Sequence, residues 1–404
     1  MTPAGLRVEP SDEAREGAAM RTLRKLAAWL MAAVMLGLLG GCTAERTFDF
    51  YDGDLSIPQP GFGERPREDT LVGISMPTRS LERWNNDGQH VQNLLQEMGF
   101  RTSLQYADQR VDLQISQIQN MINDRARILV IAPIDGTALS PVLQAAADRG
   151  IVVVSYDRLI NDTPNVDYYA TFDNELVGKK QGEFIIEKLG LDRGETGPFN
   201  IELFAGSPDD NNARFFFKGA YDMLKPYIDS GVLVSPSGKV PTSIDHWTQV
   251  GIQGWASATA QNEMENRINS FYGGGKRVDV VLSPNDSLAL GITQALLGAG
   301  YQPGADFPIL TGQDADVANV QNIIDGTQSM TVWKDTRTLG EQVALMVSQI
   351  ADGVEVEVND TETYDNGVRI VPAYLLDPVV IVRDDIQEYL IDSGFLRANQ
   401  VHGL

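Results

Sequence analysis

The chain has 404 residues, of which 43% are hydrophobic, and this is enough apolar material for two medium-sized domains with real cores. Its formal net charge is −23, which disfavours nucleic acid and anionic surfaces as partners. The 3 His and 1 Cys exclude a disulfide within the chain and make a Cys/His metal site unexpected, and we expect no cofactor.

Residues 1–41 have the composition and order of a signal peptide. Arg21, Arg24 and Lys25 form a positive region, and the apolar stretch Leu26–Leu39 follows it. This stretch is short for a bilayer-spanning helix but has the length of a signal-peptide core. Met20 is the expected true start, because the residues before it include four acidic ones, which a signal peptide does not need at its beginning.

Cys42 is the expected site of lipidation. The run Leu39-Gly40-Gly41-Cys42 resembles a lipobox, in which small residues precede a cysteine that is diacylated and becomes the mature N-terminus. The alternative is a buried helix that holds an inert cysteine. Residues 42–68 are rich in proline, glycine and charge, which predicts a tether. We therefore expect an extracytoplasmic protein, lipid-anchored to the outer face of the cell membrane or periplasmic.

From residue 69 onward, apolar β-branched runs alternate with amphipathic segments of helical length, which is the βαβ pattern of a parallel sheet. The expected strands of the first half are Thr70–Ser75, Thr102–Tyr106, Ile128–Ala132 and Ile151–Tyr156. The expected helices between them are Gly88–Met98, Leu113–Asn123 and Thr137–Arg149. The nearly uniform apolar character of the fourth strand indicates burial on both faces.

The pattern restarts at Asp173, which predicts a second α/β lobe with a cleft between the two. Its expected helices are Glu175–Leu189, Asn212–Ile228, Ala256–Phe271 and Ser287–Gly298. Its expected strands are Phe199–Phe204, Val232–Val234, Val278–Leu282 and Phe307–Leu310. The tail from Thr311 holds one more strand and helices, and periodicity alone does not decide to which lobe it returns.

Polar residues follow nearly every predicted strand. In parallel sheets, the crevice beyond the carboxyl ends of the strands is where ligands bind. Fixed donors and acceptors in such a crevice, with tryptophans nearby, suit a small neutral polyhydroxy ligand such as a sugar. The turns after the strands contribute Asp157 and Arg158, Asp209 to Asn212, Asn285 and Asp286, Gln313 and Asp314, and Lys334 and Asp335.

Several short segments, taken in order, carry a resemblance to a known family. They are Leu81-Glu82-Arg83-Trp84, Ser116-Gln117-Ile118-Gln119-Asn120-Met121-Ile122, Tyr156-Asp157-Arg158, Gly206-Ser207-Pro208-Asp209-Asp210-Asn211-Asn212-Ala213, Lys225-Pro226-Tyr227-Ile228-Asp229-Ser230-Gly231, Gly312-Gln313-Asp314-Ala315-Asp316 and Thr331-Val332-Trp333-Lys334. From about residue 70 to 400, the chain resembles type I periplasmic sugar-binding proteins of ABC importers, in particular the xylose-binding and multiple-sugar-binding branch.

The resemblance implies an α/β fold with two Rossmann-like lobes joined by a three-strand hinge. It places residues 69–172 and 314–375 in the N-terminal lobe, and residues 173–313 and 376–404 in the C-terminal lobe. The implied crossings between lobes fall near Phe172-Asp173, near Gly312–Asp314 and at about Tyr374–Leu376.

The resemblance also implies a set of sugar-binding residues. Asp209 or Asn211 is the alternative helix cap within its cluster, and Asp286 is either a ligand or a cap. The implied ligands are Arg83, Trp84, Asp157, Arg158, Asp210, Asn212, Trp255, Asn285, Asp314 and Lys334.

Trp255 matches the family's tryptophan that stacks on the apolar face of the sugar, with Trp84 and Trp247 as competitors. The chain departs from the family here. Family members often have an acidic residue or arginine beside this tryptophan, whereas this chain reads Gln253-Gly254-Trp255-Ala256. The departure leaves open which sugar fits.

The function implied is a monomeric receptor for xylose-, glucose-, galactose- or arabinose-like aldoses that delivers sugar to ABC permease subunits. The alternative is a sugar sensor for chemotaxis or two-component signalling. A secreted glycosidase is disfavoured, because the cleft carboxylates lie among Arg, Lys and Asn residues that hold them ionised, so no proton donor is apparent. A repressor of the lactose-repressor type shares this fold but needs a DNA-binding module where this chain has a secretion signal.

Overall fold

The computed structural model describes residues 62–63 and 65–404. The predicted signal peptide, Cys42 and most of the predicted tether lie outside the described residues. Within the described part, no helix has the length and apolar character needed to cross a membrane.

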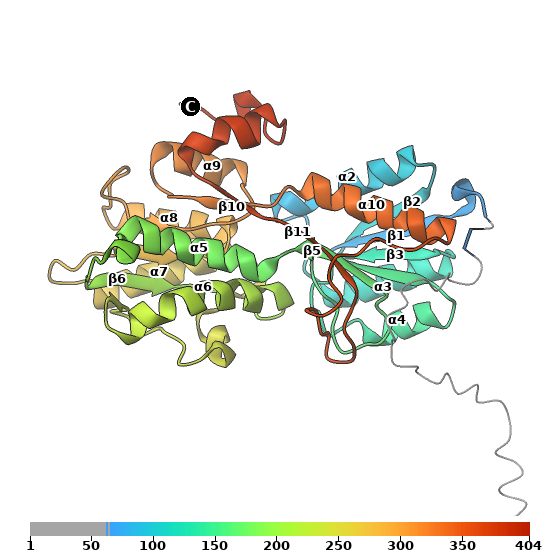
Figure 1. Ribbon diagram of the computed structural model, residues 1–404, viewed down its shortest axis with the longest axis horizontal. Coiled ribbons are helices and arrows are strands. Elements are labelled where there is room, and N and C mark those ends of the chain that lie inside the picture. Colours follow the sequence, from blue (N-terminus) through green and yellow to red (C-terminus); the bar gives the residue numbers. More distant parts are fainter. Residues whose placement is uncertain (1–61, 64) are drawn as a thin grey trace, which may run out of the picture. The chain divides into compact units, whose positions relative to one another are not determined.

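The first lobe is built on a parallel six-stranded sheet with strand order β11-β5-β4-β3-β1-β2 (Figure 1). Strands β1, β3 and β4 are buried along their whole length, as their apolar sequences predict. The strands are β1 Leu71–Met76, β2 Arg101–Tyr106, β3 Ile128–Ile131, β4 Val152–Tyr156, β5 Tyr168–Phe172 and β11 Ala373–Leu376.

Helices cover both faces of this sheet. Apolar residues of α2 and α10 pack against one face, and those of α3 and α4 pack against the other. Each helix buries one stripe and leaves the rest in water, as its periodicity predicts. The helices are α2 Glu82–Glu97, α3 Val111–Asn123, α4 Ser140–Ala147 and α10 Thr336–Asp352.

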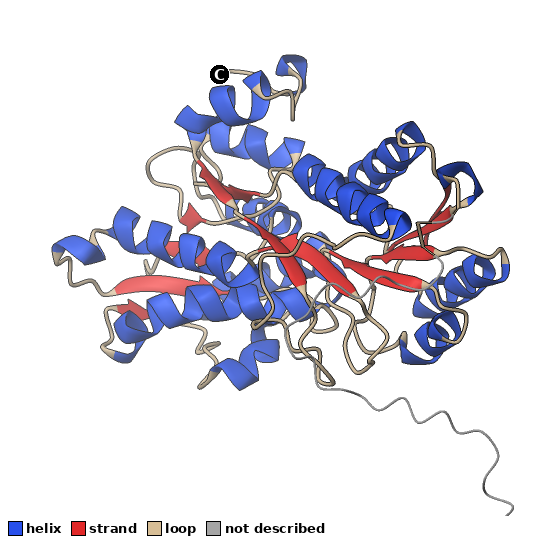
Figure 2. Cartoon of the chain, turned by 45° about the vertical axis from the view of Figure 1, so that its right-hand side comes forward, coloured by secondary structure: helices blue, strands red, loops and turns tan. Residues whose placement is uncertain are grey.

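The second lobe has a parallel four-stranded sheet with strand order β7-β6-β8-β9. Figure 2 shows its strands between layers of helices. The strands are β6 Phe199–Leu203, β7 Leu233–Val234, β8 Val280–Leu282 and β9 Ile309–Leu310. The helices are α5 Asn174–Leu189, α6 Asn211–Asp229, α7 Ser257–Phe271, α8 Asp286–Gly298 and α9 Val317–Asp325.

Two further strands extend the second sheet beyond β9. Strand β10 (Thr331–Trp333) pairs antiparallel with β12 (Val379–Ile381), and a bridge between Gln313 and Val332 joins the pair to the end of β9. Short 3-10 helices are Arg67–Asp69, Leu191–Arg193, Ile244–Val250, Gln253–Trp255, Arg383–Asp385 and Ala398–Gln400, and a π-helix spans Ile386–Asp392.

The chain crosses between the lobes three times. The first crossing follows Phe172 at the end of β5, and the third follows Leu376 at the end of β11. The second crossing does not lie at Gly312–Asp314, as we expected, but between β10 and α10, at residues 334–335.

The assignment of residues 314–375 to the first lobe was therefore wrong for its first third. Helix α9 is amphipathic, and its buried residues Val320 and Ile323 pack in one cluster with Ile386 and Leu390 of the C-terminal segment. Together with the pairing of β10 and β12, this packing keeps residues 315–333 in the second lobe. The tail returns to the first lobe only with α10 and β11.

Candidate ligand-binding site

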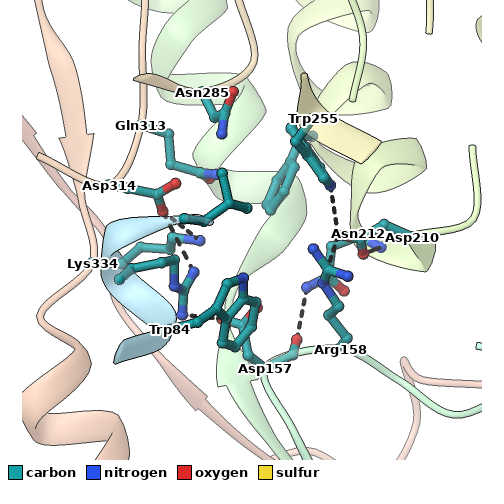
Figure 3. Close-up of a pocket in the computed structure, with 13 residues that line it drawn as sticks. Trp84, Asp157, Arg158, Asp210, Asn212, Trp255, Asn285, Gln313, Asp314 and Lys334 are labelled. Carbon is teal, nitrogen blue, oxygen red and sulfur yellow. Dashed lines mark hydrogen bonds and ion pairs between the residues drawn. The ribbon is translucent and has the colours of Figure 1, made fainter. Parts of the chain in front are cut away.

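The ten residues predicted to bind ligand all line one pocket between the two lobes (Figure 3). The space among its side chains, including the part open to solvent, is about 300 Å³. The pocket is lined by Leu81, Arg83, Trp84, Asp157, Arg158, Asp210, Asn212, Phe216, Trp255, Asn285, Gln313, Asp314 and Lys334.

The turn after β4 places Asp157 and Arg158 at the pocket. Asp157 has a φ of 59°, a left-handed conformation that side chains rarely adopt. Its carbonyl oxygen accepts three hydrogen bonds, from Tyr169 Oη at 2.7 Å, Thr171 Oγ1 at 2.9 Å and Asn212 Nδ2 at 2.7 Å. Two of these donors belong to β5 and one to the second lobe, so the strained turn is held by its neighbours.

Arg83, in the first turn of α2, is held by three carboxylates. Its Nη2 donates to Asp87 Oδ2 and to Asp157 Oδ2, both at 2.9 Å, and its Nη1 lies 3.5 Å from Asp314 Oδ1. Its guanidinium also lies 4.5 Å from the centre of the Trp84 ring. Burial opposes the charge, but the carboxylates outweigh it and raise the pKa of Arg83 well above its ordinary value. The group therefore stays a cationic donor.

Two carboxyl groups of the pocket, those of Asp157 and Asp210, have pKa values shifted in opposite directions. Burial acts to raise the pKa of Asp157, but Arg83, Lys334 and Arg158 outweigh it, so this pKa is lowered. Burial raises the pKa of Asp210 despite the attraction of Arg158, and the charge of Asp157 adds to the increase. Asp157 therefore stays ionised, whereas the ionised form of Asp210 is stabilised by the charge of Arg158.

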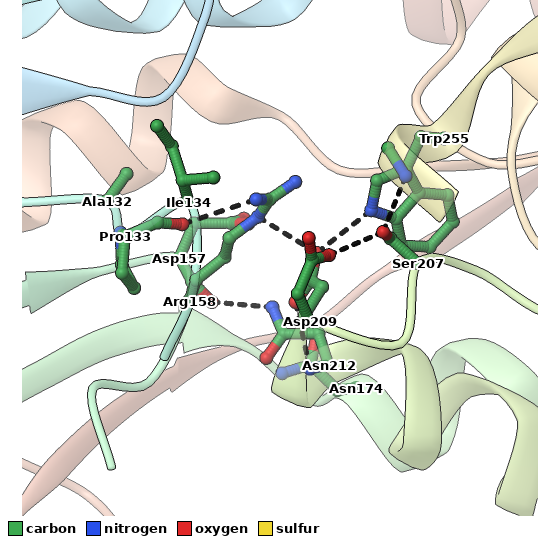
Figure 4. A network of polar contacts seen from close by, with 12 residues as sticks. Ala132, Pro133, Ile134, Asp157, Arg158, Asn174, Ser207, Asp209, Asn212 and Trp255 are labelled. Carbon is green, nitrogen blue, oxygen red and sulfur yellow. Dashed lines mark hydrogen bonds and ion pairs between the residues drawn. The ribbon is translucent and has the colours of Figure 1, made fainter. Parts of the chain in front are cut away.

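Arg158 and Asp210 join the lobes. Figure 4 shows the surrounding network, with Pro133 and Arg158 on one side and Ser207 and Trp255 on the other. Arg158 Nε lies 2.8 Å from Asp210 Oδ2, and both side chains are buried. Arg158 Nη1 donates to Pro133 O at 3.2 Å, and Trp255 Nε1 donates to the same Asp210 oxygen at 3.1 Å. Asp210 is also the N-cap of α6, accepting from Asn212 N at 3.0 Å. Lining the pocket and capping the helix are therefore combined in one residue.

Asp209, the alternative cap, has a different role. Its carboxylate accepts from Ser207 Oγ and, at 2.5 Å, from Gln253 Nε2. Ser207 Oγ in turn accepts from Gly254 N at 2.7 Å. These contacts fix the loop that precedes Trp255.

Asn285 and Asp286 also have different structural roles. Asn285 lines the pocket and is the N-cap of α8, with Oδ1 accepting from Leu288 N at 3.1 Å. Asp286 is fully buried beneath the pocket and accepts from Gln328 Nε2 at 2.9 Å and Thr331 Oγ1 at 3.1 Å. It neither caps the helix nor lines the pocket.

Trp84 and Trp255 line the pocket from opposite lobes (Figure 3). Trp255 has a φ of 55°, and its ring lies so close to Gly206 that a Cβ there would be 2.0 Å from Trp255 Cη2. Phe216 meets the same ring edge-on at 6.3 Å between centres. Trp247, the third candidate, is instead buried in the core of the second lobe.

Three lining residues escaped the prediction. Leu81 and Phe216 follow core-like apolar patterns, so no sequence signal separates them from packing residues. Gln313 had a signal, since it lies in the turn after β9 beside Asp314. Within the described part of the chain, Gln313 Oε1 and Trp84 Nε1 are buried and have no hydrogen-bond partner.

The pocket presents fixed donors and acceptors between two indole rings. Guanidinium, ammonium and indole N–H groups donate, and carboxylate and amide oxygens accept. Such a set binds a compact molecule with several hydroxyl groups, each of which donates and accepts. Among residues 62–63 and 65–404, no group of three or more His, Cys, Asp and Glu residues is arranged to hold a metal ion.

Two parallel α/β lobes joined by three crossings, with a polar pocket between them, define the class of two-lobed ligand-binding proteins. The sequence pattern of the periplasmic binding protein domain family matches residues 72–355. The chain belongs to this family, whose members are extracytoplasmic binding proteins and not enzymes.

Relatives and a solved structure agree with this membership. The multiple sugar-binding periplasmic receptor ChvE of Rhizobium radiobacter is 49% identical over 331 residues, 82% of this chain and 92% of the relative. The multiple sugar-binding periplasmic protein SbpA of Azospirillum brasilense is 50% identical over 325 residues, 80% and 89% of the two chains. An ABC transporter solute-binding protein from Clostridium phytofermentans, solved with β-D-glucose, has 51% identity and a TM-score of 0.79, covering 82% of this chain and all of that one.

These matches confirm the expected family, its multiple-sugar-binding branch and the expected fold class. They also confirm that the chain is a binding protein, because the family is one of substrate-binding proteins.

Proposed function

We propose that this protein binds an aldose outside the cytoplasm and delivers it to an ABC importer. The observation that carries the proposal is the pocket itself, in which buried polar groups from both lobes converge. Trp84 Nε1 and Gln313 Oε1 lack partners among the described residues, although buried polar atoms are nearly always paired. A sugar hydroxyl accepts from the indole and donates to the amide, and so satisfies both.

We assign ligand contacts to the ten predicted residues and add Gln313. Asp157 and Asp314 accept from hydroxyl groups, while Arg83, Arg158 and Lys334 donate to them. Hydrogen bonds to charged groups contribute roughly 1.5–3 kcal/mol each when desolvated, which is enough to select hydroxyl geometry.

We assign the two tryptophans to the apolar faces of the sugar ring, one on each side. Trp84 Nε1 adds a donor to this contact, and Trp255 is held in place by its bond to Asp210. A pyranose has such faces, and a relative with 51% identity has been solved with β-D-glucose. Glucose is therefore the first ligand to test.

Calorimetry against aldopentoses and aldohexoses tests the function. We expect about one site per chain and a free energy of roughly −8 kcal/mol or better, which is micromolar affinity. Glucose, galactose, xylose and arabinose form the core of the panel, with mannitol as an open-chain polyol control. If calorimetry detects no binding to any of these sugars, the proposal is refuted. Turnover of nitrophenyl glycosides would point to an enzyme instead.

We further propose that the mature protein is a monomer anchored through acyl chains on Cys42. The lipobox-like Leu39-Gly40-Gly41-Cys42 supports the anchor. Two acyl chains hold a protein stably, whereas one gives only marginal attachment. Location outside the cytoplasm is a property of the family, but the lipid anchor is our proposal for this chain.

A further inference from the structure

A hollow at the far end of the first lobe is lined by four arginines. Arg65, Arg125, Arg127 and Arg149 surround it, and among the described residues the rest of its lining is apolar or neutral. We call this feature the arginine hollow.

The strands fix where the arginine hollow lies. Arg127 directly precedes β3, and Ile151, also in its lining, directly precedes β4. The sheet is parallel, so these are amino ends of strands, whereas Asp157 of the sugar pocket follows the carboxyl end of β4. The arginine hollow and the sugar pocket therefore lie at opposite edges of one sheet.

The positive charges of three arginines in the hollow are not neutralised by carboxylates of the described residues. Arg65, Arg125 and Arg149 are exposed, and within the described residues none of the three forms an ion pair. Arg149 Nη1 donates only to a neutral group, Asn123 Oδ1, at 3.2 Å. Burial lowers the pKa of Arg127, and the nearby charge of Arg65 lowers it further.

The acidic residues nearest in sequence do not neutralise the positive charge of the arginine hollow. Asp124 and Asp148 are adjacent in sequence to Arg125 and Arg149, but both are outside the lining. Asp148 Oδ1 accepts from Gln144 Nε2 at 2.8 Å. The overall charge of −23 does not cancel it either, because salt screens charges beyond roughly 8–10 Å and leaves local patches to act on what touches them.

Guanidinium groups are the preferred partners of phosphate, which they bind with two parallel hydrogen bonds. Three convergent arginines that form no ion pair among the described residues therefore suit a surface rich in phosphate. The described chain also begins here, since the ring of Phe62 lies 4.5 Å beneath the Arg127 guanidinium. Along the chain, the arginine hollow is thus the part of the first lobe nearest to Cys42.

We propose that the arginine hollow binds the phosphate headgroups of anionic phospholipids and holds this end of the first lobe against the membrane surface. The partner is a membrane rather than a soluble phosphate compound, because the hollow lies where the chain enters the folded part from the predicted anchor. The inference rests on the proposed lipid anchor at Cys42 and on the extracytoplasmic location of the family, and it does not depend on sugar binding.

Arginine modification by phenylglyoxal, read by mass spectrometry, tests this on the full chain in vesicles. Vesicles of phosphatidylcholine with phosphatidylglycerol are compared with vesicles of phosphatidylcholine alone. We expect the anionic vesicles to slow modification of Arg65, Arg125 and Arg149 at least fivefold, and added salt to remove the protection. Arg193 and Arg277 of the second lobe are internal controls and should react equally in both.

Paired variants separate the hollow from overall charge. Arg127 lines the same hollow and should also be protected by anionic vesicles in the parent, so it is kept in both variants as the reporter. It should lose its protection when Arg65, Arg125 and Arg149 are replaced by Gln. It should stay protected when Arg193, Lys276 and Arg277 are replaced by Gln, which removes the same charge from the second lobe.

Three results would overturn the proposal. They are equal modification in the two kinds of vesicle, equal loss of protection in both variants, and protection by inorganic phosphate alone without any further effect of anionic vesicles. The last result would identify a site for soluble anions. A failure of sugar binding would leave all of these readings unchanged, so the two proposals fail separately.

Discussion

Arg158 of the first lobe and Asp210 of the second form an ion pair across the cleft, with Nε 2.8 Å from Oδ2. Both residues line the pocket, and Asp210 also caps α6 and accepts from Trp255. The same two side chains thus line the pocket and connect the two lobes. A ligand that touches both lobes favours the closed state in proportion to its differential affinity for that state.

Replacing Arg158 with Ala should weaken sugar binding by about 10- to 100-fold, because a desolvated charged hydrogen bond contributes roughly 1.5–3 kcal/mol. The substitution leaves Asp210 buried without its cation. X-ray scattering of the parent should show a smaller radius of gyration with sugar than without it, and the variant should lose most of this compaction.

Arg110→Ala is the matched control, because Arg110 is exposed and its one ion pair within the described part of the chain is with the exposed Asp112. It should bind and compact like the parent. Arg158 has only a structural role if its Ala variant binds sugar and compacts as the parent does.

Gly206→Ala should displace the Trp255 ring. The new Cβ would lie 2.0 Å from Cη2, and no flexible end of a side chain is available to yield. We expect sugar affinity to fall at least tenfold and stability to fall by about 1–3 kcal/mol, as in other overpacked cores. Calorimetry and thermal unfolding measure the two effects.

Gly298→Ala is the control for Gly206→Ala, since nothing lies within 4 Å of a Cβ at that position near the end of α8. It should leave affinity unchanged and stability equal or slightly higher. An unchanged affinity in Gly206→Ala would show that the position of the Trp255 ring does not matter for binding.

Asp316→Asn should make stability less dependent on pH. Burial and the charges of Asp314 and Glu82 raise the pKa of Asp316 to about 7, and burial also raises the pKa of the neighbouring Asp286. The folded state therefore holds more protons than the unfolded state above the ordinary carboxyl pKa, and unfolding free energy falls as pH rises toward 7. Asp316 is only partly buried, so we expect a loss of about 1–2 kcal/mol between pH 5 and 7 in the parent.

Thermal unfolding at these two pH values measures this difference. It should shrink in Asp316→Asn but persist in Asp325→Asn, an exposed change at the end of the neighbouring helix α9. Equal pH dependence in the parent and in Asp316→Asn would show that Asp316 does not hold the proton.

Replacing Cys42 with Ser should abolish acylation. Labelling of cells with an alkyne fatty acid should mark the parent protein and not the variant, and mass spectrometry of the mature N-terminus should find a diacylated cysteine. Gly41→Ala, which keeps a small residue before the cysteine, should be labelled like the parent. Equal labelling of Cys42→Ser would show that the lipid is attached elsewhere or that Cys42 is no anchor.

The sequence alone determined the two-lobed α/β fold and most of the candidate site. Parallel strands gather their carboxyl ends at one edge, so polar residues after successive strands meet even when they are far apart in the chain. This is why Asp157, Arg158, Asn285 and Lys334 were found from pattern and resemblance, and why all four line the pocket.

Tertiary structure alone decided where the tail belongs and which apolar residues face the pocket. The apolar stripe of α9 would be buried equally well against either lobe, and only packing against the C-terminal segment places it in the second. Phe216 and Leu81 have the periodicity of core residues, and Trp247 resembles Trp255 in composition. Periodicity identifies the face of an element that is buried, but the neighbouring elements decide whether that face meets a core or a pocket.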